Sequence, residues 1–272
     1  MVAKRIRLDA ELVRRKMCDS RERARDLIAH GRVIVNGVAA TKPATQVEPT
    51  TSIALTASDE PEWASRGAHK LVGALDAFDV DVDGLRCLDA GASTGGFTDV
   101  LLSRGARRVE AVDVGYGQLV WRLRNDERVG VYDKTNVRAL GPEDIGGEVD
   151  LVVSDLSFIS LALVLPAMAR CVRPGGDLLP MVKPQFEVGK DRVGQGGVVR
   201  DPSLRIEAVT AVARKASGLG LQVRGCVASP LPGPSGNVEY FLHLRRVDDA
   251  TPGGLDHDAE AAIRTAVEEG PQ

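Results

Sequence analysis

The chain has 272 residues, of which 43% are hydrophobic, and its formal net charge is −3 at pH 7. This length allows one large domain and a small one, and the hydrophobic content is sufficient to fill their cores. No run of eighteen apolar residues occurs, and the charged N-terminus lacks the apolar core of a signal peptide, so we expect a soluble, cytoplasmic protein without a membrane span. The four cysteines are scattered, so neither a disulfide framework nor a metal site is expected.

Positive charge is concentrated near the N-terminus. Residues 1–42 contain eleven Lys and Arg against five Asp and Glu, a net +6, whereas the remaining 230 residues carry 24 against 33, a net −9. A surface rich in Lys and Arg can replace counterions along a phosphate backbone, although such charge often belongs only to a solvated face. The pattern of the surrounding residues has to distinguish these two interpretations.

Residues 6–55 have the pattern of a small α+β module. Asp9 and Ser20 each precede apolar residues at helical spacing, so we expect them to cap two short helices. The Asn36-Gly37 pair that follows predicts a tight hairpin turn between two short strands.

This module resembles the RNA-binding module first described in a small-subunit ribosomal protein and shared by pseudouridine synthases and tyrosyl-tRNA synthetases. The resemblance covers about fifty residues and is carried by Arg7-Leu8-Asp9 and by residues 20–24 and 27–37. It implies that residues 1–56 form an RNA-binding domain whose helix pair presents cations to RNA phosphates. The residues implicated in this way are Arg5, Arg7, Arg15, Arg21 and Lys42.

Residues 57–65 are predicted to join two domains. The stretch TASDEPEWAS combines Ser, Asp, Glu and Pro without apolar periodicity, which is typical of a linker. Trp63 is expected to pack against a neighbouring domain rather than to contact a ligand. The second domain is predicted over residues 66–247, and residues 248–272 form an acidic tail with a short helix near residues 259–268.

The second domain alternates strand and helix patterns, beginning with a helix over residues 66–78. This alternation predicts a mostly parallel sheet with helices on both faces, and the short connection between the last two strands predicts an antiparallel final pair. The expected fold class is therefore α/β, a Rossmann-like seven-stranded sheet together with the small N-terminal α+β domain. The strands are predicted at residues 86–90, 109–112, 129–132, 149–155, 177–183, 221–228 and 239–244.

A glycine-rich turn, residues 91–96, follows the first of these strands. It has neither the Gly-x-Gly-x-x-Gly spacing of a dinucleotide site nor the ending of a P-loop. In open parallel sheets, ligands bind beyond the carboxyl ends of the strands, and glycines there let the backbone approach a ligand closely. Asp113 ends the second strand, where a carboxylate can accept both hydroxyls of a ribose. The pattern favours a nucleoside-containing ligand over a purely structural turn.

The stretch DAGASTGGFT at residues 89–98 resembles the S-adenosylmethionine turn of the FtsJ-type ribose methyltransferases. The resemblance implies S-adenosylmethionine as the cofactor, and this molecule has no pyrophosphate, in agreement with the missing dinucleotide spacing. It also implies which residues line the cofactor. These are Gly91, Ser93, Thr94, Gly95 and Phe97 on the methionine side, Asp113 and Val114 at the ribose, and Thr135 and Asn136 at the adenine.

Four charged residues fall at the ends of predicted elements around this turn. A ribose hydroxyl is a poor nucleophile at neutral pH, so its methylation needs a group that draws its proton away, and a desolvated lysine suits this role. Each residue alone also has a structural explanation, as a loop cap or a solvated side chain. The four are Lys70 in the helix before the sheet, Asp155 and Lys183 at the ends of the fourth and fifth strands, and Glu239 at the start of the last.

Together these four residues match, in order and position, the Lys-Asp-Lys-Glu tetrad of ribose methyltransferases. The resemblance assigns Lys183 to the activation of the 2′-hydroxyl. It assigns Asp155 and Glu239 to orienting that hydroxyl and holding the lysines, and Lys70 to tuning charge and position.

The tetrad, the N-terminal module and the stretches SRGAHKL and KPQFEVG resemble the TlyA family of bacterial ribosomal RNA methyltransferases over residues 4–246. The resemblance implies methylation of a cytidine ribose in small-subunit ribosomal RNA, with an effect on capreomycin susceptibility. The longer, more basic N-terminus is similar to the subgroup that also methylates the large subunit. The implied partner is ribosomal RNA within ribosomal subunits, with no membrane partner, and a monomer is expected.

Three other functions compete with this one. Relatives of the TlyA family are often labelled haemolysins, but the sequence has no segment that could span a bilayer. A non-catalytic RNA-binding or ribosome-assembly factor would not need an intact glycine turn and tetrad. A dehydrogenase is disfavoured by the missing Gly-x-Gly spacing.

Overall fold

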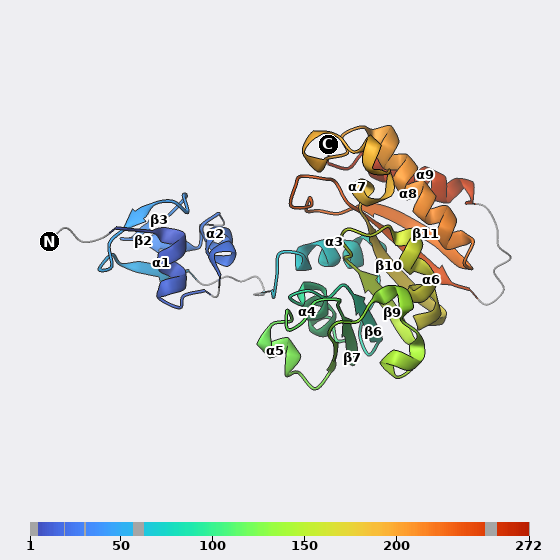
Figure 1. The fold of residues 1–272 in the computed structure, drawn as a ribbon, viewed down its shortest axis with the longest axis horizontal. Helices are drawn as coiled ribbons and strands as arrows, with labels where there is room; N and C mark the ends of the chain where they lie inside the picture. Colours follow the sequence, from blue (N-terminus) through green and yellow to red (C-terminus); the bar gives the residue numbers. More distant parts are fainter. Residues whose placement is uncertain (1–4, 19, 30, 57–62, 248–254, 272) are drawn as a thin grey trace. The chain divides into compact units, whose positions relative to one another are not determined.

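The computed structural model describes residues 5–18, 20–29, 31–56, 63–247 and 255–271. The chain divides into two compact units, Met1–Glu62 and Trp63–Gln272, and the first is the blue part of Figure 1. Residues 57–62 of the expected linker lie outside the described residues. Trp63 packs against the apolar core of the second unit.

The N-terminal unit packs two short helices against short antiparallel strands. Its core consists of buried apolar side chains from both helices together with Val33 and Val47. The turn at Asn36-Gly37 has positive φ at both residues and joins paired strands, which confirms the predicted hairpin. The elements are β1 (Ile6–Arg7), α1 (Leu8–Arg14), α2 (Arg21–Ala29), β2 (Val33–Val35), β3 (Val38–Ala39), β4 (Gln46–Val47) and β5 (Ile53–Leu55).

The two helix caps of this unit differ from each other. The Ser20 hydroxyl oxygen accepts the Arg23 N–H at 3.1 Å, so the predicted cap of α2 is confirmed. The prediction that Asp9 caps α1 is wrong, because the N-cap is Arg7 and Asp9 lies inside the first turn. The Asp9 carboxylate is bound instead by arginine side chains.

The second unit is an α/β domain whose strands and helices alternate along the chain (Figure 1). Its strands are β6 (Arg86–Ala90), β7 (Arg108–Val112), β8 (Val129–Tyr132), β9 (Val149–Ser154), β10 (Val172–Val182), β11 (Leu221–Ala228) and β12 (Tyr240–Arg246). Its helices are α3 (Ala68–Phe78), α4 (Gly96–Ser103), α5 (Trp121–Arg124), α6 (Leu161–Cys171), α7 (Pro184–Glu187), α8 (Pro202–Ser217) and α9 (His257–Glu268). Short 3-10 turns lie at Val137–Ala139, Pro142–Ile145, Lys190–Arg192 and Gln195–Gly197.

The seven strands form one sheet in the order β11-β12-β10-β9-β6-β7-β8. Neighbouring strands from β10 to β8 are parallel, and β12 is antiparallel to both β10 and β11. This arrangement confirms the predicted fold class and the antiparallel final pair. The strand order reverses beside β6, where β7 and β8 lie on one side and β9 and β10 on the other. Such a reversal is where open α/β sheets bind ligands.

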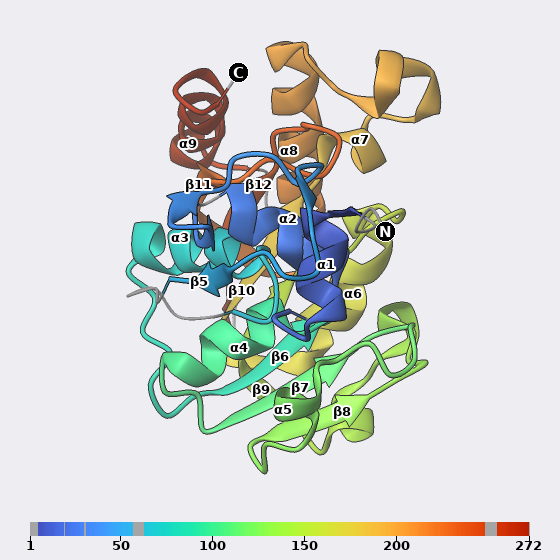
Figure 2. The same cartoon turned by 90° about the vertical axis from the view of Figure 1, so that its left-hand side faces the viewer.

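Side chains alternate between the two faces of the sheet and build two apolar layers. On one face, β6 and β10 pack against α6, α8 and α9. On the other face, the intervening residues pack against α3, α4 and α5. Figure 2, turned by 90° from Figure 1, views the domain from this face. Ile263 and Val267 of α9 are fully buried, so this helix of the expected acidic tail belongs to the core. Among the described helices, none combines the length and apolar character needed to cross a bilayer.

Candidate active site

The glycine turn lies at the carboxyl end of β6, where the strand order reverses. Gly91 and Gly95 have φ values of +93° and +102°, which favour glycine because a side chain would be strained there. A Cβ on Gly91 would also lie 2.9 Å from the carbonyl oxygen of Asp155 at the end of β9. The turn therefore packs closely against the end of the neighbouring strand, and this packing requires glycine at residue 91.

Asp113 is held in a fixed orientation beside this turn. Its Oδ2 accepts the backbone N–H of Ser93 at 2.8 Å, and its Oδ1 accepts that of Gly115 at 2.6 Å. Each carboxylate oxygen keeps a further lone pair, so two ligand hydroxyls can still be accepted. The side chain predicted to bind a ribose thus lies beside the predicted turn.

The other residues predicted to line the cofactor are placed in different ways. Val114 follows Asp113 and is exposed, and the Thr135 N–H donates to the Asp113 backbone carbonyl oxygen at 2.9 Å. The Asn136 side chain accepts the Arg138 N–H and caps a 3-10 turn. Phe97 is buried, and its ring packs against Phe241 with 6.0 Å between ring centroids. The roles of these residues toward the cofactor stay predictions.

Asp89, the last residue but one of β6, is a buried carboxyl group that the sequence analysis did not single out. Its Oδ2 accepts the Thr98 hydroxyl at 2.7 Å, and its Oδ1 has no hydrogen-bond partner among the described residues. Burial raises the pKa of Asp89 to about 7. The signal in the sequence was a charged residue inside an apolar strand.

S-adenosylmethionine fits this donor set. Asp89, Asp113 and Asp155 end three adjacent strands around the turn, and a cluster of carboxyl groups suits a ligand that carries positive charge at its sulfonium and ammonium groups. The buried Oδ1 of Asp89 is an acceptor at this edge of the sheet that has no hydrogen-bond partner among the described residues.

The four residues of the predicted tetrad form two ion pairs. Lys70 Nζ lies 2.5 Å from Glu239 Oε2, and both side chains are buried. Lys183 Nζ lies 2.6 Å from Asp155 Oδ1, and the lysine side chain is only 7% exposed. A lysine held in this way is desolvated and has a fixed position, as the predicted chemistry requires.

The sheet brings the two pairs to the same edge. Val182 pairs with Tyr240 in the antiparallel ladder, so the adjoining Lys183 and Glu239 lie at neighbouring strand ends. Glu239 Oε1 is buried and has no hydrogen-bond partner among the described residues, although buried carboxylate oxygens are normally satisfied. A Cβ on Gly233 would lie 2.5 Å from this oxygen, so glycine keeps the space beside it open.

An aromatic pair, also missed, joins the loop after β9 to the segment after Lys183. Phe158 is 92% exposed and its ring packs on that of Phe186, with 5.3 Å between centroids. The residue has φ +62°, a conformation that a bulky side chain rarely adopts. No sequence pattern gives that backbone conformation, but exposed aromatic rings are surfaces on which unpaired bases stack.

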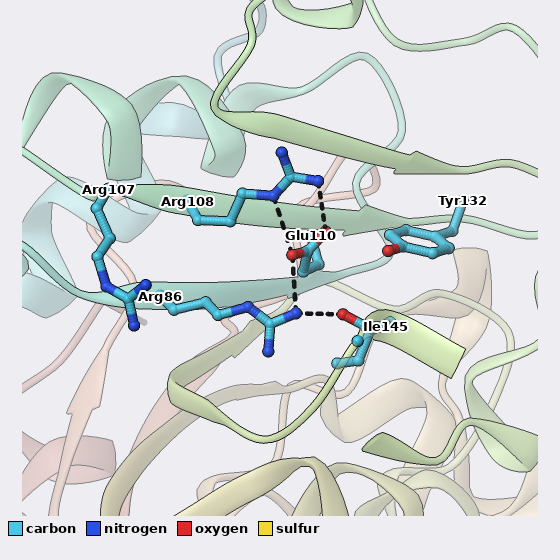
Figure 3. Close-up of a pocket in the computed structure, with 7 residues that line it drawn as sticks. Arg86, Arg107, Arg108, Glu110, Tyr132 and Ile145 are labelled. Carbon is cyan, nitrogen blue, oxygen red and sulfur yellow. Dashed lines mark hydrogen bonds and ion pairs between the residues drawn. The ribbon is translucent and has the colours of Figure 1, made fainter. Parts of the chain in front are cut away.

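A second cluster of charge lies at the opposite, amino end of the sheet, beside an open pocket of about 650 Å³ (Figure 3). Figure 3 shows Glu110 between the guanidinium groups of Arg86 and Arg108, which donate to Glu110 Oε1 at 2.9 and 3.0 Å. Arg86 also donates to the backbone carbonyl oxygens of Ile145, Gly147 and Glu148. Because Arg86 and Arg108 make their hydrogen bonds within the protein, we assign no ligand to this pocket.

The predicted RNA-binding arginines of the N-terminal unit divide into two kinds. Arg7 and Arg21 bind the fully buried Asp9 at 3.1 and 2.9 Å, while about half of each arginine side chain is exposed. The hydrogen bond from Arg7 and the charge of Arg21 hold the pKa of Asp9 well below its usual range. Arg15, in contrast, donates to Glu11 and to carbonyl oxygens of the loop at residues 48–51.

The two remaining cations of this predicted set lie at the surface. Arg5 is two-thirds exposed, with its Nε 3.5 Å from Glu48 Oε1, and Lys42 is exposed. Within the described ranges, no group of three or more His, Cys, Asp or Glu side chains is arranged to hold a metal ion.

Comparison with known families agrees with both units. Residues 63–246 match the FtsJ-like methyltransferase family, and residues 6–53 match the S4 domain. The 16S/23S rRNA (cytidine-2'-O)-methyltransferase TlyA of Mycobacterium tuberculosis is 60% identical over 272 residues, covering 99% of this chain and 100% of that protein.

Other relatives carry a different name. Hemolysin A of Brachyspira hyodysenteriae is 37% identical over 240 residues, which are 88% of this chain and 99% of that one. A solved structure of a candidate hemolysin from Streptococcus thermophilus superimposes with a TM-score of 0.76 at 36% identity, covering 98% of this chain and 96% of that one. The fold, the carboxyl-edge site and these relatives lead to one conclusion: the chain belongs to the TlyA family and is a methyltransferase with an FtsJ-like domain and an N-terminal S4 domain.

Proposed function

We propose that this enzyme transfers a methyl group from S-adenosylmethionine to the ribose 2′-hydroxyl of a cytidine in ribosomal RNA. The observation that carries the proposal is the pair of buried lysine–carboxylate contacts, Lys70–Glu239 and Lys183–Asp155, at the same sheet edge as the glycine turn. The M. tuberculosis relative is named for the same reaction.

The chain's own residues supply binding and orientation. The backbone of residues 91–96 and the Asp113 carboxylate hold the cofactor, and the buried Asp89 lies two residues before this turn in β6. When bound, the cofactor supplies a methyl group on a sulfonium, so that a new carbon–oxygen bond forms as the carbon–sulfur bond breaks and its electron pair stays on sulfur.

Lys183 is the group that takes up the proton of the attacking hydroxyl. Its Nζ is fixed by Asp155, so it can be aligned with the acceptor oxygen before reaction, and such positioning supplies much of the rate. The Lys70–Glu239 pair lies beside it and contributes a second positive charge near the developing alkoxide. The unpartnered Glu239 Oε1 provides an acceptor for the hydroxyl in the ground state.

RNA binding and methyl transfer are assigned to different units. Residues 1–56 bind RNA phosphates through their half-exposed arginines, and residues 66–247 carry out methyl transfer. The exposed ring of Phe158, next in the chain to the Ser157 that contacts Lys183, supports an acceptor whose base is turned out of its helix. We further propose that the enzyme acts as a cytoplasmic monomer on RNA within both ribosomal subunits, and that its loss alters capreomycin susceptibility.

The test is methyl transfer from labelled S-adenosylmethionine to separately purified small and large ribosomal subunits, followed by mapping of the modified nucleotide. We expect label at a cytidine ribose in each subunit. Lys215→Ala, a change on the exposed side of α8, serves as the control variant and should behave as the wild-type chain does.

The alternatives give different results in the same assay. Tight subunit binding without transfer of label would identify a ribosome-assembly factor and overturn the proposal. Label on a base rather than a ribose would retain the methyltransferase but overturn the assignment of the acceptor. Release of dye from liposomes by the purified protein would favour the activity that the haemolysin name describes.

A further inference from the structure

Lys183 has a second partner that lies outside the tetrad. Its Nζ donates to the Ser157 hydroxyl oxygen at 2.9 Å, in addition to its contact with Asp155 Oδ1 at 2.6 Å. A lysine nitrogen has three hydrogen-bonding directions besides its bond to carbon. The hydrogen bond to Ser157 occupies one of them, and the Asp155 carboxylate lies against the nitrogen as an ion pair. Within the described residues, the third direction has no other recorded partner and is the one available to an acceptor hydroxyl.

The loop that carries Ser157 is built to hold it in place. Ser157 lies two residues beyond Asp155, and the next residue, Phe158, has the left-handed conformation and packs outward on Phe186. A bulky residue in this conformation costs energy and persists only where the surroundings impose it. The turn at Phe158 sends the aromatic ring to the surface while the preceding hydroxyl faces Lys183.

The same loop is fastened to the segment after Lys183 at its other end. Glu187 Oε2 accepts the Ser160 hydroxyl at 2.6 Å, and Glu187 Oε1 accepts the Leu161 N–H at 2.8 Å. The contacts at Ser157 and at Glu187 therefore join the β9 and β10 loops at two separate points. The position of Ser157 relative to Lys183 is fixed by the fold rather than by a single flexible contact.

We propose that Ser157 is a positioning residue that aims Lys183 at the acceptor hydroxyl, an inference that rests on the proposed function. With Asp155 as the sole anchor, the lysine nitrogen could swing about that contact. The second anchor fixes the tetrahedral nitrogen, so its third direction points at one place. This direction carries the lone pair that takes the proton and afterwards the N–H of the ammonium.

A hydroxyl is suited to this role for a chemical reason. It can both accept and donate hydrogen bonds, so Ser157 can stay bound to Lys183 before and after the lysine takes up a proton. An ionised carboxylate only accepts, so Asp155 can bind the lysine only where the nitrogen carries an N–H. The pair of anchors thus holds the nitrogen through the change of charge that the reaction requires.

The test compares Ser157→Thr with Ser157→Val, two variants of nearly equal shape that differ in the hydroxyl. We expect the Val variant to lose about tenfold or more in kcat on ribosomal subunits, because a small displacement of a catalytic group has a large effect on rate. The Thr variant should stay within about threefold of the wild-type chain. In both variants the KM for the subunit and the calorimetric affinity for S-adenosylmethionine should change less than about twofold.

The outcomes separate this inference from the proposed function. If the wild-type chain methylates a ribose and Lys183→Ala does not, but the Val variant is as active as wild type, Ser157 has no positioning role. Equal losses in the Thr and Val variants, or a loss confined to KM, would also contradict it. Absence of ribose methylation by the wild-type chain would overturn both proposals. Thermal unfolding of the two variants shows whether either has lost its fold.

Discussion

Charged side chains are buried at both ends of the central sheet, but the two ends differ in whether their hydrogen bonds are complete. At the amino end, Arg86 and Arg108 enclose the buried Glu110, and Arg86 also donates to backbone carbonyl oxygens. At the carboxyl end, the buried oxygens Asp89 Oδ1 and Glu239 Oε1 have no hydrogen-bond partner among the described residues. An open pocket lies at the amino end, yet these unsatisfied oxygens lie at the other.

This difference teaches how to distinguish a structural charge cluster from a reactive one. A buried polar group without a partner costs free energy, so a fold retains it where a ligand completes the bonding. The presence of an open pocket would therefore not have identified the carboxyl end. Four changes test or sharpen the comparison, and they follow from the largest expected effect to the smallest.

Lys183→Ala should have the largest effect on activity. Removing the group that takes up the proton is expected to lower kcat about 10³-fold, since positioned acid–base groups contribute on this order. Affinity for S-adenosylmethionine, measured by calorimetry, should change little because the lysine contacts Asp155 and Ser157 rather than the glycine turn. Turnover close to wild type would remove Lys183 from the mechanism.

Glu110→Ala should affect stability instead of chemistry. The substitution leaves the largely buried Arg86 without its carboxylate partner. Removing one member of a buried ion pair lowers the free energy of unfolding by roughly 3 kcal/mol. Urea unfolding should report this loss, while kcat on ribosomal subunits stays within about twofold of wild type. A selective loss of kcat in the folded variant would show that the amino end contributes to the reaction.

Asp89→Asn should change how stability depends on pH. The folded-state pKa is raised from 3.8 to about 7, so the folded protein binds more protons than the unfolded chain between these values. The stability of the wild-type chain therefore falls as pH rises through this window, by up to roughly 1.4 kcal/mol per pH unit from this group. The free energy of unfolding of the variant should therefore rise relative to that of the wild type as pH increases from 4.5 to 8. A difference between the two that stays constant with pH in urea unfolding would contradict this.

Arg21→Ala should have the smallest effect, because its carboxylate partner is buried but the arginine is half exposed. The free faces of the guanidinium can bind one phosphate, so RNA affinity should fall and the slope of log K against log salt should decrease by about one. Filter binding at several salt concentrations measures this slope. Arg15→Ala is the contrast, since its donors are used within the unit, and there we expect lower stability with an unchanged slope.

Much of the fold could be predicted because its signals are local. Alternating strands and helices, the glycine turn and the Asn36-Gly37 hairpin each depend on a few neighbouring residues. The start of β10 was misplaced: Val172 begins it, five residues before the predicted start at Asp177. Pro174 and the glycines that follow indicate a turn, but the strand continues through an irregular register there.

The residues of the candidate site could be predicted, but which of them form ion pairs with one another could not. Positions in the helix before the sheet and at strand ends identified Lys70, Asp155, Lys183 and Glu239. The contact of Lys70 with Glu239, however, joins residues 169 positions apart and depends on the completed sheet. Asp9 shows the same limit in the N-terminal unit, since its binding by Arg21 from the second helix replaced the expected cap. Ser157 escaped notice because its role depends on the backbone conformation of Phe158.

The insertion of β12 between β10 and β11 has a consequence for biosynthesis. Glu239 precedes this late strand, so a nascent chain exposes Lys70 long before the carboxylate that neutralises it has been translated. Until then β10 is an open edge that can pair with other chains. A product truncated before residue 239 would thus lack both its counter-ion and its edge protection, which couples completion of synthesis to acquisition of activity.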